Sequence, residues 1–135
     1  MKNEFISYEQ AVALKELGFD EPCFGNYEDG KDSFYLFEQN FKENTNSYYD
    51  EEVSAPLKQQ VFKWFRENHQ LNSWVYNSDL NKYFFTILQN GRIVKANKSF
   101  LTYEEAELAC LNKLIEIVKN DNTSKQKIYD NQRIW

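Results

Sequence analysis

The sequence of 135 residues has few of the side chains that build metal sites, disulfide frameworks and nucleophile pairs. It contains one histidine, His69, and two cysteines, Cys23 and Cys110. Zinc sites need three or four ligands at short spacings, which these scattered residues do not provide. Two cysteines also cannot form a disulfide framework, so we expect both thiols to be reduced. A catalytic Cys–His pair would require the fold to bring distant residues together.

Glycine and long apolar runs are also scarce. The four glycines, Gly18, Gly25, Gly30 and Gly91, form no glycine-rich phosphate loop of the P-loop or dinucleotide-binding kind. No stretch approaches the roughly 18 apolar residues of a membrane helix. The polar residues 1–4 are followed by no apolar signal-peptide core. We therefore expect a cytoplasmic protein that has no cofactor or metal and does not enter a membrane.

Acidic residues are abundant, but their placement does not indicate acid–base catalysis. The pairs Glu51-Glu52 and Glu104-Glu105 fall at predicted solvent-facing or helix-capping positions, whereas a general acid needs a dry pocket. Glu107 differs, because on a helical wheel it lies between apolar positions of its helix. We interpret it as a residue of the first turns, where the core tapers and the helix dipole favours an anion. The prediction is a protein that is not an enzyme.

Hydrophobic periodicity and capping residues predict three helices. The first begins after Ser7 and runs to about Leu17, with Gly18 as its C-terminal cap. The second begins at Ser54 and fades near His69. The third begins at Thr102, which forms a capping-box pattern with Glu105, and ends near Lys119.

Strand patterns between the second and third helices predict a sheet. Runs at 73–76, 83–88 and 92–96, with Asn90-Gly91 as a tight turn, predict a three-stranded antiparallel meander. The fold class is α+β: a helix, then helix, meander and helix, with the helices packed on one sheet face. We expect a single domain over residues 1–120 and a polar C-terminal tail over 121–135.

The N-terminal half contains weaker patterns. Asp29-Gly30 is a hairpin signal before a strand near 33–37, and residues 40–52 are predicted to be a surface loop.

The predicted core draws on the second and third helices. Its members are Leu57, Val61, Trp64, Phe65, Ala106, Cys110, Leu114 and Ile117.

Charge is distributed unevenly along the chain. Residues 1–56 hold 4 Lys and 13 Asp or Glu, a net charge of −9, and residues 57–135 hold 12 Lys or Arg and 8 Asp or Glu, a net charge of +4. Acidic residues with interspersed aromatics predict a protein-binding surface. Its candidate residues are Tyr27, Glu28, Asp29, Asp32, Tyr48, Tyr49, Asp50, Glu51, Glu52 and Trp135. We expect Trp135 either to dock on its own domain or on a second copy in a homodimer, or to anchor a partner.

Nucleic acid is the alternative partner. The order of elements over 54–119 is that of a double-stranded-RNA-binding domain, and the region is rich in cations. Its candidate residues are Lys58, Lys63, Arg66, Lys82, Arg92, Lys95 and Lys98. Such domains carry lysines at the start of the last helix, where this chain has glutamates that would repel phosphates. A third class, a small-molecule binder with an aromatic pocket, also stays open.

Three blocks of the sequence together cover about a third of the chain: Tyr8 to Phe24, Ser54 to Glu67 and Thr102 to Leu111. They resemble a family of small uncharacterised proteins from bacteriophages and mobile elements of Bacteroidetes bacteria. The resemblance implies no activity. It does imply a phage protein in the cytoplasm of a bacterial host, a setting that favours binding to a host component, including inhibition of a defence protein.

Overall fold

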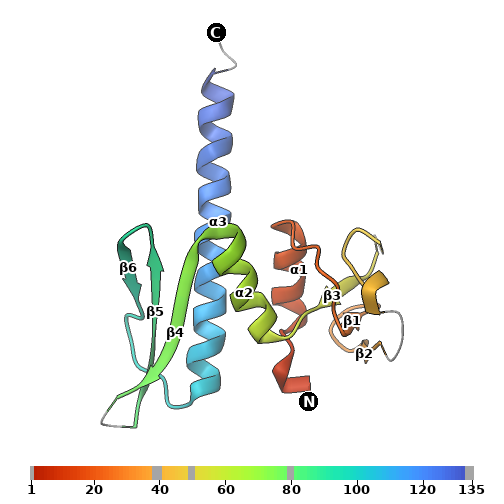
Figure 1. Ribbon diagram of the computed structural model, residues 1–135, viewed down its shortest axis with the longest axis horizontal. Coiled ribbons are helices and arrows are strands. Elements are labelled where there is room, and N and C mark those ends of the chain that lie inside the picture. The colour runs from red at the N-terminus through yellow and green to blue at the C-terminus, as the bar shows by residue number, and fades with distance from the viewer. Residues whose placement is uncertain (1, 38–40, 49–50, 79–80, 133–135) are drawn as a thin grey trace. The chain divides into compact units, whose positions relative to one another are not determined.

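The computed structural model describes residues 2–37, 41–48, 51–78 and 81–132 (Figure 1). Within these residues the chain is α+β, as predicted, with three α-helices and two three-stranded antiparallel sheets. It divides into two compact units, residues 1–64 and 65–135. Each unit has its own sheet, and for the first unit the sequence predicts only a hairpin with a strand near 33–37.

Helix α1 (Tyr8–Glu16) follows a short 3-10 helix, η1 (Lys2–Glu4), and begins where the sequence predicts. Ser7 Oγ accepts a hydrogen bond from the Gln10 N–H (3.2 Å), and Gln10 Oε1 accepts one from the Ser7 N–H (3.4 Å). These two bonds complete a capping box. Gly18 has a φ of +95°, which ends the helix in a conformation that glycine adopts at little cost.

The sheet of the first unit has the order β2-β1-β3. Strands β1 (Gly25–Tyr27) and β2 (Phe34–Leu36) form the predicted hairpin, and β3 (Val53–Ala55) pairs with β1 on its other side. Helix α1 packs against β3. A Cβ atom at Gly25 would lie 2.8 Å from the Phe34 ring and 2.9 Å from the Ala55 carbonyl oxygen. The central strand therefore needs glycine where its neighbours approach most closely.

The segment before the second helix corrects two predictions. Residues 41–48, predicted as surface loop, contain the 3-10 helix η2 (Phe41–Glu43) and the buried side chains of Asn44 and Asn46. Ser54 is the middle residue of β3 and not a helix cap. Its N–H donates to Asn46 Oδ1 (3.0 Å) and its hydroxyl to Asn44 Oδ1 (3.3 Å). These long-range bonds hold Ser54 in the sheet, and sequence periodicity does not reveal them.

Helix α2 (Lys58–His69) begins four residues later than predicted and crosses the boundary between the units. Within the first unit, the Trp64 ring packs edge-on against Phe19, with ring centroids 5.4 Å apart. Gln60 Nε2 donates to the Pro22 carbonyl oxygen (2.9 Å). The start of α2 is therefore tied to the turn that follows α1.

The second unit contains the predicted meander, in the order β4-β5-β6. Its strands are β4 (Leu71–Asn77), β5 (Tyr83–Gln89) and β6 (Arg92–Lys95). Asn90 and Gly91 have φ values of +49° and +79°. Both residues are thus in the left-handed region that a two-residue hairpin turn requires, which explains the strength of the Asn-Gly signal.

Helix α3 (Tyr103–Gln132) packs against β4 and β5 and is longer than predicted (Figure 1). Thr102 Oγ1 caps it by accepting from the Glu105 N–H (3.1 Å), while Glu105 Oε2 accepts from the Leu101 N–H (3.3 Å). The helix continues into residues predicted as tail. After Gly91 the sequence has no glycine or proline to stop it. Trp135 lies outside the described residues, so the prediction about its docking stays a prediction.

Most of the predicted core is buried. Six members, Val61, Trp64, Phe65, Ala106, Cys110 and Leu114, are buried, and Leu57 and Ile117 are half-buried. Glu107 is 6% exposed, as its place on the helical wheel indicates. The expectation that α2 joins α3 on one face of the meander stays a prediction.

Candidate functional site

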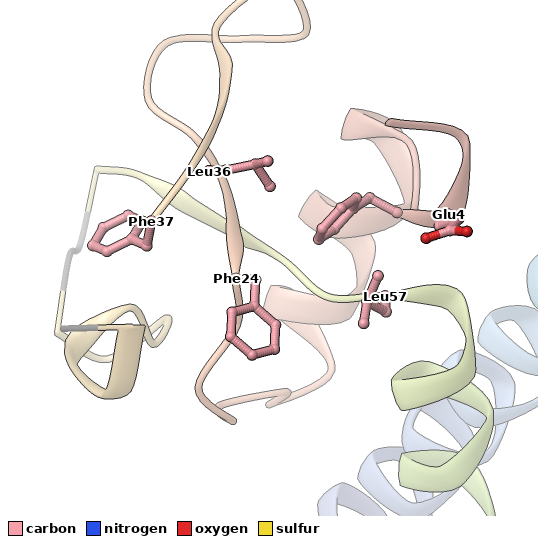
Figure 2. Close-up of a pocket in the computed structure, with 6 residues that line it drawn as sticks. Glu4, Phe24, Leu36, Phe37 and Leu57 are labelled. Carbon is pink, nitrogen blue, oxygen red and sulfur yellow. The ribbon is translucent and has the colours of Figure 1, made fainter. Parts of the chain in front are cut away.

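The first unit holds an apolar pocket of about 300 Å³ (Figure 2). Phe24 and Leu36 at its rim are 47% and 41% exposed, and Glu4 is the one carboxylate among the lining residues. The lining residues are Glu4, Phe5, Phe24, Leu36, Phe37 and Leu57. A preformed apolar hollow with exposed apolar side chains at its edge fits an apolar side chain of a ligand.

The backbone around Phe24 is fixed from two directions. The Phe37 N–H donates to the Phe24 carbonyl oxygen (2.8 Å). Asn44 Nδ2 donates to the carbonyl oxygens of Cys23 and Gly25, the residues on either side of Phe24, at 2.7 Å each. Phe24 is therefore held at the pocket by the β hairpin on one side and by a buried asparagine on the other.

Carboxylates gather at the other end of the same sheet. The pairing of Tyr27 with Val53 places Glu28 opposite Glu52, and Asp29 and Asp32 are exposed on the β1–β2 turn. Burial raises the pKa of the Glu52 carboxyl, and the nearby Glu28 raises it further, while Lys15 acts in the opposite direction. Along β2, the turn lies roughly 10 Å from Leu36. The unit thus has an apolar end and an acidic end.

The residues of the predicted acidic and aromatic surface differ in their exposure. Tyr27 is buried (3% exposed), and its hydroxyl donates to the Ile6 carbonyl oxygen (2.9 Å), so it belongs to the core and not to a binding surface. Tyr48 and Glu51 are exposed. Tyr49, Asp50 and Trp135 lie outside the described residues.

The sequence reasoning missed the pocket itself. The sequence pattern assigns Leu57 to the predicted core and gives Phe24 no role in a site. The available signal was the apolar pair Leu36-Phe37 at the end of a predicted strand. This pair lines a pocket only because Phe5 and Leu57 lie beside it, and an antiparallel bridge brings those two residues together. No local sequence pattern predicts that bridge.

The seven cations of the alternative site are divided between the units. Lys58 and Lys63 are on the part of α2 that belongs to the first unit, and Lys58 is half-buried. The other five belong to the second unit, where all are exposed: Arg66, Lys82, Arg92, Lys95 and Lys98. The structure therefore does not place the seven in one described body.

Neither thiol has the environment of a nucleophile. Cys23 and Cys110 are both fully buried. Burial raises the pKa of Cys23 far above its usual range, and Glu21 and Asp20 add to this effect. Burial also raises the pKa of Cys110 to about 11, although a hydrogen bond with Ser73 acts in the opposite direction. A thiolate nucleophile needs a lowered pKa, so these sites favour inert thiols.

The described part of the chain holds neither a metal-binding group of side chains nor a membrane-spanning helix. Among its residues, no three His, Cys, Asp or Glu side chains group so as to hold a metal ion. In the same residues, none of the helices combines the length and the apolar character needed to cross a bilayer. His69 contacts the Phe65 ring, with centroids 6.1 Å apart.

Comparison of the chain with protein-family models, with curated proteins and with solved structures finds no match.

Proposed function

We propose that this chain is a non-enzymatic module that binds a protein partner through the pocket and the acidic end of the β2-β1-β3 sheet. The pocket carries the proposal, because all but one of its lining side chains are apolar and two of them stay exposed. Interfaces gain most of their affinity from a few apolar anchors buried in pockets. An apolar side chain of the partner would fill this one.

Charge supports a partner with a basic segment next to that anchor. Residues 1–56 carry a net charge of −9, and Glu28, Asp29 and Asp32 are exposed at the end of the sheet away from Leu36. A lysine or arginine about 10 Å from the anchor would reach them. Complementary charge speeds association and excludes wrong partners.

The resemblance to phage proteins adds a setting to this proposal. In that setting the partner would be a component of the bacterial host, and the chain would inhibit or modulate it. A defence protein fits this role.

The test is a pull-down from bacterial host cells with the tagged full-length chain, nuclease treatment of the eluate, and mass spectrometry. Leu36→Gln should lose the captured partner, whereas Leu108→Gln, which changes an equally exposed leucine on α3 (43%), should retain it. Asp32→Asn should weaken capture at low salt. A partner that both leucine variants retain, or that nuclease releases, would contradict the proposal.

A further inference from the structure

The two faces of the β4-β5-β6 sheet differ in what covers them. Three side chains on one face contact α3: Ser73 with Cys110, Tyr83 with Tyr103, and Gln89 with Asp121. Side chains alternate between the faces of a strand. The residues between these three therefore point away from α3, to what we call the outer face.

The outer face carries exposed aromatic and aliphatic side chains. Trp74 is 49% exposed, Tyr76 is 39% exposed and Ile93 is 58% exposed. The rings of Tyr76 and Phe84 are stacked across β4 and β5, with centroids 5.7 Å apart and an angle of 20° between their planes. In a second row, Trp74, Thr86 and Lys95 are paired across the three strands. This row places a cation about 10 Å from an exposed indole.

Among the described residues of the three strands, no carboxylate occupies an outer-face position. The outer-face positions hold the residues Asn72, Trp74, Tyr76, Phe84, Thr86, Leu88, Ile93 and Lys95. Over residues 81–103 the sequence has four cations and no Asp or Glu. Three of those cations lie toward the end of the sheet that holds Tyr76 and Phe84: Lys82 precedes β5, Lys95 is the last residue of β6, and Lys98 follows β6.

We propose that the outer face binds single-stranded nucleic acid, with bases stacked on Trp74 and the Tyr76–Phe84 pair and phosphates next to Lys95. Aromatic rings bind bases of any sequence through stacking, and lysines neutralise the backbone. The bases of a duplex are already stacked on each other and cannot lie on a sheet. A second copy of the chain fits less well, because an isologous dimer through this face would bring one cationic region against another.

The proposal is independent of the protein-binding pocket, which belongs to the other unit. The experiment uses the full chain and fluorescein-labelled 12-mers of dT and rU, with binding followed by fluorescence anisotropy from 50 to 200 mM salt. The wild-type chain should bind both oligonucleotides, more weakly as salt rises. An unlabelled duplex 12-mer should compete poorly.

Variants distinguish base stacking on Trp74 from electrostatic attraction of the nucleic-acid backbone. Trp74→Ala should weaken binding about ten-fold or more, and Trp74→Phe should retain most of it. Tyr48→Ala, which removes an exposed ring (58%) from the first unit, is the matched control and should change nothing. Lys95→Gln should make the negative slope of log K against log salt less steep, by about 0.7. Lys113→Gln, which removes a cation paired with Glu116 on α3 (3.2 Å), should leave the slope unchanged.

Three results would overturn the proposal. The first is absence of binding at micromolar wild-type chain in 50 mM salt. The second is binding that Trp74→Ala leaves intact while the circular dichroism spectrum and unfolding midpoint are unchanged. The third is a wild-type dimer in analytical ultracentrifugation that Trp74→Ala converts to a monomer, because the occupant would then be a second copy.

Discussion

Asn26 and Asn44 are joined side chain to side chain in the interior of the first unit: Asn26 Nδ2 donates to Asn44 Oδ1 over 2.7 Å, and neither residue is exposed to solvent. Asn44 also donates to the carbonyl oxygens on both sides of Phe24. A buried amide therefore links the central strand, the segment 41–48 and the rim of the pocket. A buried polar group costs free energy unless it is hydrogen-bonded. Removing one partner of this network should therefore lower both the stability of the chain and its binding to a partner.

Asn44→Leu should destabilise the chain by roughly 2–5 kcal/mol, because it removes the amide that donates to the Cys23 and Gly25 carbonyl oxygens and accepts from the buried Asn26 Nδ2. Urea unfolding followed by fluorescence measures the change. Glu43→Gln, at the exposed neighbouring position, is the control and should change stability little. Equal stability of Asn44→Leu and wild type would show that the asparagine network does not support this unit.

Glu52→Gln should stabilise the chain at pH 7. The pKa of the Glu52 carboxyl is raised in the folded state, by burial and by Glu28, so the ionised form opposes folding. This penalty is present above the folded-state pKa and disappears as pH falls through it. The gain should be up to about 1 kcal/mol, as for like charges opposite each other in a sheet.

Thermal unfolding of wild type and Glu52→Gln at pH 7 and at pH 4 tests this prediction. The stability difference should shrink at the lower pH. Glu51→Gln, at the exposed position next to it, is the control for loss of a carboxylate and should change stability little at pH 7. A wild-type chain that is more stable than Glu52→Gln at pH 7 would contradict the sign of the argument.

Cys23 and Cys110 should both resist alkylation in the folded chain. Both thiols are buried with raised pKa values, that of Cys110 at about 11, so little thiolate forms at pH 8. Mass spectrometry after iodoacetamide should find no adduct in buffer and two adducts in urea. Replacing each cysteine with alanine should leave partner binding intact in a folded chain, and loss of binding there would reopen the question of catalysis.

Leu114→Ala should cost about 2–5 kcal/mol, because Leu114 is fully buried on α3 and the change leaves a cavity. Urea unfolding measures this cost. Leu108→Ala removes the same atoms from an exposed position of the same helix (43%) and should cost far less. Similar costs for the two variants would place Leu114 outside the core.

The sequence by itself determined the elements that depend on local signals. The capping residue Ser7, the Asn90-Gly91 turn and the apolar stripe of the third helix each predict their element, because the interactions involved span four residues or fewer. The end of α3 was misjudged since polar composition is a weak stop signal, whereas glycine and proline are strong ones.

The tertiary structure decided the sheet of the first unit, the burial of Tyr27, and the pocket. Strand β3 has only three residues, too few for a recognisable pattern, and it pairs with a strand 28 residues earlier. Asn44 and Asn46 were expected at the surface, where water hydrogen-bonds side-chain amides. They are buried instead, because carbonyl oxygens of residues far away in the sequence accept their hydrogen bonds. The same holds for the outer face of the meander: alternation shows that β4 has two faces, but only the packing of α3 determines that Trp74 is on the open one.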